Sequence, residues 1–244
     1  MNGYAIHSID ALIQGNPYVG RGIVLGVTAD GTKACAAYFI MGRSENSRNR
    51  VFYENADGEV YTRAFDESKV EDPSLIIYAA LRRYENNLIV TNGDQTDTVY
   101  DGLAAGKTFS AALESRCFEP DAPNFTPRIS GLLTFADGSC SYQMSILKSI
   151  DATGSACTRQ TFAYPATPGL GHFLHTYVTD GNPLPSFEGE PERVAIPNDV
   201  DAFAGALWNA LDANNKISLY VCYTDLATGE VEKRLFNKNA EGTK

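Results

Sequence analysis

The chain has 244 residues, of which 43% are hydrophobic and 20% charged, and its formal net charge is −10. This length suits one large domain or two small ones, with a core that needs no disulfide or metal. The acidic balance argues against a nucleic-acid partner, because duplex binding needs a basic face. The sequence has no run of about 18 apolar residues, so we expect no membrane span.

The cysteines are odd in number, widely spaced and without a C-x-x-C pair, which excludes a zinc knuckle and a thioredoxin-type motif: Cys35, Cys117, Cys140, Cys157 and Cys222. Three of them fall in strand-like runs and are predicted to be small core residues: Cys35, Cys140 and Cys222. This usage indicates a reducing, cytoplasmic setting. The first ten residues lack the basic and apolar regions of a signal peptide.

In the first half, apolar spacing predicts a short helix over 4–13. Strands are predicted as two hairpins, each turning on an Asp-Gly step, and one further strand: 22–28 with 34–41, 51–55 with 60–65, and 87–91. Residues 66–73 are predicted as a polar loop and 73–81 as a helix-like turn. One helix is predicted over 96–117, although two glycines weaken it. Three prolines exclude regular structure from 119–127.

The second half repeats the strand pattern, with predicted strands at 128–135, 141–147, 156–164, 171–179, 217–224 and 231–236. Residues 182–197 are rich in Pro, Gly and Glu and are predicted as a long surface loop. Residues 199–213 form the clearest helix, with Asp199 as its cap. Hairpins with separate helices indicate an α+β domain of two antiparallel sheets covered by helices. Since no linker is visible, we expect one domain over 1–244.

The stretch from Arg43 to Arg50 carries three arginines in a strongly acidic chain and directly follows a predicted strand. Forked guanidinium donors at a strand end indicate a site for phosphate or carboxylate. Taken alone, the stretch is more typical of a solvated hairpin tip.

Three further segments place polar side chains at the ends of predicted elements. Residues 91–98 leave a strand and enter a helix, where backbone N–H groups can face an anion; simple capping by Thr96 or Asp97 is the alternative. Residues 118–128 hold polar side chains in a proline-rich connector, which is either a rigid site or an ordinary rigid loop. Arg21 lies at a strand start, where an exposed charge is unremarkable.

Common catalytic signatures are missing from the sequence. The histidines form no H-E-x-x-H motif, and His172 and His175 are predicted to be structural. Neither a G-x-x-x-x-G-K-[ST] phosphate loop nor a G-x-S-x-G elbow is present.

Together the polar segments resemble the archaeal-type IMP cyclohydrolase family and its bacterial relatives. The matching pieces, in the family's order, are Tyr18-Val19-Gly20-Arg21; Arg43-Ser44 with Asn49-Arg50; Asn92-Gly93 with Thr96-Asp97-Thr98; and Glu119-x-Asp121 followed by Asn124-x-Thr126-Pro127-Arg128. The resemblance is best over 15–150, and 180–244 is expected to be a C-terminal extension of the same domain. The arginine loop is slightly longer than the family's pattern.

The resemblance implies a four-layer αββα fold like that of N-terminal nucleophile hydrolases, without their processed nucleophile. It also implies a reaction of purine biosynthesis: closure of 5-formamidoimidazole-4-carboxamide ribonucleotide to IMP with loss of water. Because the attacking nitrogen and the formyl carbon belong to one molecule, no metal, cofactor or covalent intermediate is expected.

The resemblance further implies roles for individual residues. Arg50 would donate to the oxyanion or formyl oxygen, Tyr78 would donate or relay a proton, and Glu119 would help to deprotonate the carboxamide nitrogen. Substrate contacts are expected from the other matching residues: Arg21, Arg43, Ser44, Asn49, Asn92, Gly93, Thr96, Asp97, Asp121, Asn124 and Arg128.

Two alternatives stay open at this point. One is a hydrolase of the same fold that acts on a different amide or nucleotide. The other is a nucleotide-binding or structural protein without turnover. Convergence of Arg50, Tyr78 and Glu119 on one pocket would favour an enzyme. The expected partner is a small purine nucleotide; the sequence is silent on oligomeric state, so a homo-oligomer also stays open.

Overall fold

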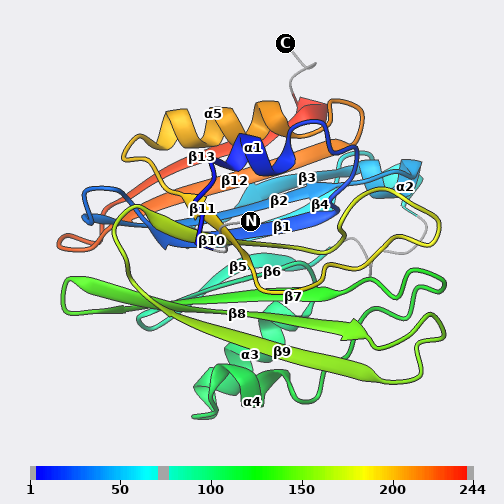
Figure 1. Ribbon diagram of the computed structural model, residues 1–244, viewed down its shortest axis with the longest axis horizontal. Coiled ribbons are helices and arrows are strands. Elements are labelled where there is room, and N and C mark those ends of the chain that lie inside the picture. The colour runs from blue at the N-terminus through cyan, green and yellow to red at the C-terminus, as the bar shows by residue number, and fades with distance from the viewer. Residues whose placement is uncertain (1–3, 71–76, 241–244) are drawn as a thin grey trace.

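The computed structural model describes residues 4–70 and 77–240, which form two antiparallel sheets (Figure 1). The six-stranded sheet has the order β11 (Glu192–Ala195), β10 (Leu170–His175), β1 (Arg21–Val27), β2 (Lys33–Met41), β12 (Lys216–Asp225) and β13 (Val231–Asn237). The seven-stranded sheet follows chain order: β3 (Arg50–Glu54), β4 (Val60–Ala64), β5 (Ala79–Tyr84), β6 (Asn87–Thr91), β7 (Arg128–Ala136), β8 (Ser139–Ser149) and β9 (Cys157–Pro165). The predicted α+β class with two antiparallel sheets is therefore confirmed.

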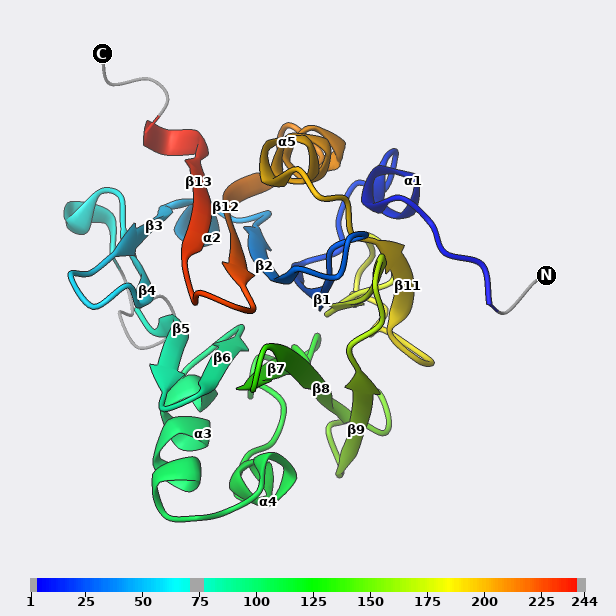
Figure 2. The ribbon, with the colours of Figure 1, turned by 90° about the vertical axis from the view of Figure 1, so that its left-hand side faces the viewer.

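The two sheets face each other, and helices cover their outer faces (Figures 1 and 2). Helices α1 (Ile9–Ile13) and α5 (Val200–Ala210) lie on the six-stranded sheet, and α3 (Gln95–Ala104) and α4 (Phe109–Leu113) lie on the seven-stranded sheet. A short helix, α2 (Glu45–Arg48), and two 3-10 turns, η1 (Glu67–Lys69) and η3 (Lys238–Ala240), complete the described elements. None of the described helices is long and apolar enough to span a membrane.

Strand β2 shows how the sequence builds this arrangement. Its alternate residues Ala34, Ala36, Tyr38 and Ile40 belong to the core between the sheets, and the residues between them pack under α1 and α5. A strand that is covered on both faces is apolar throughout, and its alternation sorts the side chains into two separate cores. The three cysteines predicted as core residues are buried.

The predicted hairpins and the helix near the C-terminus are confirmed. Strands β1 and β2, β3 and β4, β7 and β8, and β12 and β13 pair as neighbours in the expected places. Asp199 caps α5, because its carboxylate accepts hydrogen bonds from the N–H groups of Asp201 (2.8 Å) and Ala202 (3.2 Å).

The single helix predicted over 96–117 is wrong, since the structure has two helices there. Gly106 adopts a φ of 75°, the left-handed conformation that commonly ends a helix. Thr108 then starts α4 by accepting a hydrogen bond from the N–H of Ala111 (3.3 Å). The break lets α4 fold back beside α3, so both cover the same sheet.

Three other predictions need correction where long-range pairing overrides local pattern. The helix-like turn predicted over 73–81 is strand β5 from Ala79 onward, and residues 73–76 lie outside the described ranges. The predicted loop 182–197 contains strand β11, which pairs with β10 at the sheet edge. The first helix covers only Ile9–Ile13, because His7 forms a β-bridge with Val194.

Candidate active site

At one end of the space between the sheets, apolar side chains give way to arginines. Ile23 and Leu25 of β1 face the inter-sheet core, and Arg21 lies two residues before Ile23 on the same face. In the opposite sheet, Phe52 faces this core and Arg50 precedes it by two residues. The strand period of two therefore brings one arginine from each sheet to the same end of the core.

These arginines line a cavity of about 350 Å³, within the size range of small-molecule sites. The lining comes from both sheets, α2 and the connector that leads to β7: Arg21, Ser44, Asn46, Ser47, Arg50, Glu119, Pro120 and Asp121. Five predicted site residues are in this lining: Arg21, Ser44, Arg50, Glu119 and Asp121.

Arg50 is held by the short helix α2. Its Nε donates to the carbonyl of Ser47 (2.8 Å), and one of its terminal nitrogens donates to the Ser47 hydroxyl (2.6 Å). Ser44 caps the same turn by accepting from the N–H of Ser47 (3.1 Å). Arg50 is only 2% exposed, and burial together with the charge of Arg21 lowers its pKa. An arginine remains charged after such a shift, so it presents an oriented cation to the cavity.

Arg21 adds a second positive charge to this cavity. One terminal nitrogen donates to the hydroxyl of Tyr18 (3.5 Å). Desolvation lowers the pKa of Arg21, but interactions with Tyr18, Tyr78 and Glu119 outweigh it and raise the pKa overall. The lining holds two arginines and two carboxylates, Glu119 and Asp121. Because Thr126 already donates to the Asp121 carboxylate, the two guanidinium groups can still bind an anionic ligand.

Glu119 is partly buried, and the pKa of its carboxyl is raised because burial outweighs the lowering effect of Arg21 and Arg128. A carboxyl whose pKa is raised towards neutral is better suited to accept a proton during a reaction. The glutamate also has a fixed backbone, since its N–H donates to the carbonyl of Thr126 (2.9 Å).

Asp121 stabilises the conformation of the connector to β7, which contains Glu119. Its carboxylate accepts hydrogen bonds from the N–H of Thr126 (2.7 Å) and from the Thr126 hydroxyl. That hydroxyl lies 2.6 Å from the hydroxyl of Tyr177, which stacks on Tyr18. Polar contacts of this kind, together with the prolines, hold a segment without regular structure in one conformation.

Tyr78 lies directly before β5, is buried and is not part of the cavity lining, but it interacts electrostatically with Arg21 and Arg50. Its hydroxyl is 2.8 Å from the hydroxyl of Tyr38 on β2, so the pair spans the two sheets. Sequence reasoning missed Tyr38. The available signal was a tyrosine inside an apolar strand, because a buried phenol needs a hydrogen-bond partner.

Arg128 is positioned by the segment between β6 and α3. One terminal nitrogen donates to Asp94 and to the side-chain oxygen of Gln95, both at 2.7 Å. Gly93 makes room for this contact, because a Cβ there would lie 2.7 Å from both Arg128 Nη1 and Gln95 Oε1. The same Cβ would lie 3.6 Å from Glu119, so this segment borders the glutamate.

Asn92 joins β6 to β7. Its amide donates to the carbonyl of Pro127 (2.9 Å), and its oxygen accepts from the N–H of Ile129 (2.9 Å) and from Gln95 (2.8 Å). The side chain is therefore engaged in holding the start of β7, where Arg128 lies.

The remaining predicted residues lie outside the cavity lining and make contacts with other parts of the protein. Arg43 pairs with Asp180 (2.6 Å) on the surface, and Asp97 pairs with Arg82 (2.8 Å). The others bond to backbone groups or to a buried threonine: Asn49 to Asp66, Asn124 to the N–H of Leu184, and Thr96 to Thr91. Substrate contacts by these five residues stay predictions.

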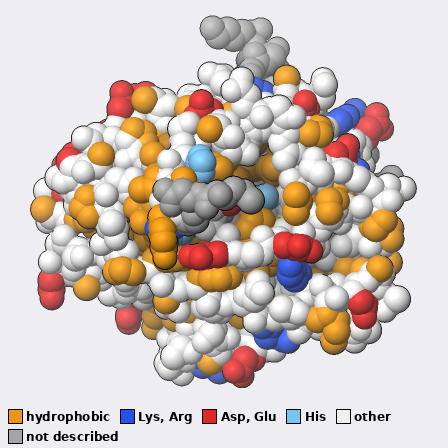
Figure 3. Space-filling view, viewed as in Figure 1, with side chains coloured by type: hydrophobic (Ala, Val, Ile, Leu, Met, Phe, Trp, Pro, Cys, Tyr) orange, Lys and Arg blue, Asp and Glu red, His pale blue; other side chains and the backbone are white. Residues whose placement is uncertain are grey.

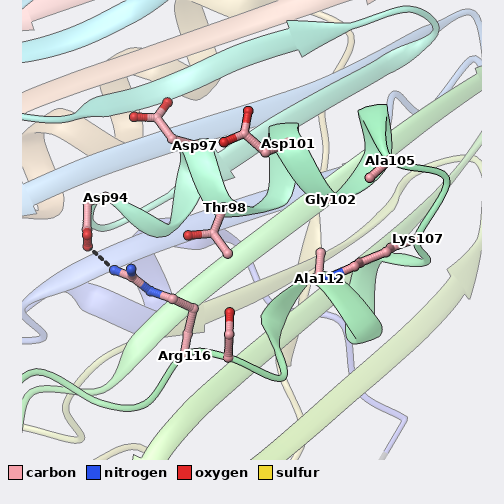
Figure 4. A pocket seen from close by; sticks show the side chains of 10 residues that line it. Asp94, Asp97, Thr98, Asp101, Gly102, Ala105, Lys107, Ala112 and Arg116 are labelled. Carbon is pink, nitrogen blue, oxygen red and sulfur yellow. Dashed lines mark hydrogen bonds and ion pairs between the residues drawn. The ribbon is translucent and has the colours of Figure 1, made fainter.

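A second cavity, of about 440 Å³, lies between α3 and α4 (Figure 4). Asp94, Asp97 and Asp101 line it, against Lys107 and Arg116. Asp94 is engaged by Arg116. The excess of carboxylates makes this cavity a poorer anion site than the cavity with the two arginines. On the face shown in Figure 3, charged side chains of both signs are scattered.

The family model of the IMP cyclohydrolase-like proteins matches residues 18–230. The chain belongs to this family. Among its relatives, an IMP cyclohydrolase of Methanopyrus kandleri is 35% identical over 117 residues, which are 46% of this chain and 57% of that protein. An IMP cyclohydrolase of Methanocaldococcus jannaschii is 29% identical over 117 residues, or 48% of this chain and 56% of that protein. The family match thus includes the cavity residues, while the chain spans little more than half the length of these relatives.

Proposed function

We propose that this member of the IMP cyclohydrolase-like family closes 5-formamidoimidazole-4-carboxamide ribonucleotide to IMP with loss of water. The observation that carries the proposal is that Arg50 and Glu119, on different elements, line one cavity. Tyr78 interacts electrostatically with Arg21 and Arg50. The relatives' names, the family match and the convergence of Arg50 and Glu119 on one cavity support an enzyme rather than a protein without turnover.

The reaction needs proton transfer and charge stabilisation rather than an external nucleophile. The carboxamide nitrogen attacks the formyl carbon, Glu119 takes the proton that this nitrogen loses, and Arg50 stabilises the negative charge on the formyl oxygen. Tyr78 donates a proton to that oxygen, which becomes a hydroxyl. The protonated Glu119 then gives its proton to this hydroxyl, which leaves as water, while the formamido nitrogen loses its proton to the Tyr78 tyrosinate and the ring C=N bond forms. Proximity is supplied by the substrate, so the cavity must hold the reactive rotamer.

The positively charged side chains around the reacting groups bind the nucleotide. Arg21 shares the cavity with Arg50, and Arg128 interacts electrostatically with Glu119. Guanidinium groups suit phosphate because they bind it through two parallel hydrogen bonds. We assign these two arginines to the phosphate, ribose or base edge.

We also propose that the chain has an N-terminal-nucleophile-hydrolase-like fold, forms a single domain and acts in the cytoplasm. The arrangement of helices, two facing sheets and helices supports an N-terminal-nucleophile-hydrolase-like fold. Strand β12 pairs with β2 and β13 within the six-stranded sheet, so the C-terminal segment completes a sheet that begins at β1. This shared sheet supports a single domain.

The direct experiment mixes the purified chain with the formamido ribonucleotide and follows IMP by absorbance. We expect clear acceleration over spontaneous closure, and Arg50→Ala should lose about 100- to 1,000-fold in kcat, as is typical when an oxyanion donor is removed. No acceleration by the wild-type chain would refute the proposed function. Equal losses of rate and of stability in Arg50→Ala would show that Arg50 is structural.

A further inference from the structure

Tyr38 is a buried tyrosine of the inter-sheet core that interacts electrostatically with both cavity arginines. It lies on β2, faces the inter-sheet core and is only 1% exposed. Its ring packs against Phe52 with centroids 5.5 Å apart, and its hydroxyl lies 2.8 Å from that of Tyr78. Arg21 and Arg50 both interact electrostatically with Tyr38. Both hydroxyls therefore belong to core residues that interact with the two cavity arginines.

The direction of this hydrogen bond decides what Tyr78 can do. Each phenol has one proton, and one of these protons must lie between the two oxygens. If Tyr78 donates to Tyr38, its proton is occupied and is not available to a substrate. If Tyr38 donates, the Tyr78 proton is free for another acceptor, such as a bound substrate.

We propose that Tyr38 is a positioning residue that donates its hydroxyl proton to Tyr78 and so directs the Tyr78 proton at the substrate. Once Tyr78 has given up that proton, the Tyr38 hydroxyl and the charges of Arg21 and Arg50 stabilise the tyrosinate. Burial raises the pKa of Tyr38, which keeps it protonated and able to act as this donor. The inference rests on the proposed function, in which Tyr78 is the proton donor.

Tyr38→Phe tests the inference, because it removes the hydroxyl and keeps the ring against Phe52. We expect kcat for IMP formation to fall about 10- to 100-fold, below the usual range for loss of a full acid catalyst, and KM to change less than about threefold. In a Tyr78→Phe background, the same substitution should lower kcat by less than about twofold, because residues that act as a unit are not additive.

Tyr142→Phe is the matched control. Tyr142 is also a buried tyrosine of the inter-sheet core with one side-chain partner, since its hydroxyl lies 2.7 Å from His172 Nδ1. We expect it to lower the melting temperature about as much as Tyr38→Phe does and to leave kcat unchanged. A structural role for Tyr38 would make the two variants alike in kcat as well.

The possible outcomes distinguish the role of Tyr38 from the proposed ring-closure activity of the chain. An active wild type with unchanged kcat in Tyr38→Phe, or with the same loss in both backgrounds, would overturn the role of Tyr38 alone. A rise in KM without loss of kcat would also overturn it. A wild-type chain that fails to accelerate ring closure would refute the proposed function and this inference with it.

Discussion

Glu119 experiences two opposing effects on the pKa of its carboxyl. Burial raises the pKa, and the neighbouring arginines lower it, with burial prevailing. A raised pKa means that the folded chain holds this proton more tightly than the unfolded chain does. The stabilising effect of the protonated carboxyl is therefore present at low pH and is lost as the pH rises through the pKa of Glu119. Its use as a base requires the opposite, deprotonated form.

We therefore expect kcat/KM to fall on the acid side with a midpoint above 4.5, the ordinary pKa of a glutamate. The measurement is a pH–rate profile of kcat/KM for IMP formation by the wild-type chain. Activity should rise over the pH range in which the contribution of Glu119 to stability declines. An acid limb at or below pH 4.5 would show that Glu119 is not the base whose ionisation controls the rate.

Short elements, rather than long ones, place the charged groups of the site. The turn of α2 holds Arg50 through Ser47, and the segment before α3 holds Arg128 through Asp94 and Gln95. Sequence analysis located both segments because their polar density was visible. The sequence did not show that Arg21 lines the cavity and Arg43 does not. Arg43 pairs instead with Asp180, which lies 137 positions further along the chain.

Gly93→Ala tests the positioning of Arg128. The added Cβ would crowd the side-chain ends of Arg128 and Gln95 and would touch Glu119 only at an ordinary 3.6 Å, so we expect stability to change by less than about 1 kcal/mol. Displacing the guanidinium should raise KM about 10- to 100-fold, the equivalent of one hydrogen bond to a charged group. Gly205→Ala in α5, where a Cβ meets nothing within 4 Å, is the control and should leave KM unchanged. An unaltered KM in Gly93→Ala would show that Arg128 does not contribute to substrate binding.

At the scale of the whole molecule, the site exists because two facing sheets bring distant residues to one end of their shared core. Arg21 and Tyr38 come from one sheet, and Arg50 and Tyr78 come from or directly precede strands of the other. Local signals predicted the hairpins, since each Asp-Gly or Thr-Gly turn is encoded within a few residues. The pairing of β11 with β10 and the contact of Tyr38 with Tyr78 depend on tertiary structure, so no local pattern revealed them.

The central claim is that Glu119 is the base in a ring closure carried out in this cavity. The most direct test compares wild type and Glu119→Gln for the rate of IMP formation and for the Kd of IMP. We expect the wild type to accelerate closure and Glu119→Gln to lose about 100- to 10,000-fold in kcat, with a Kd within about threefold of the wild-type value. A Glu119→Gln variant that forms IMP at the wild-type rate would contradict the account.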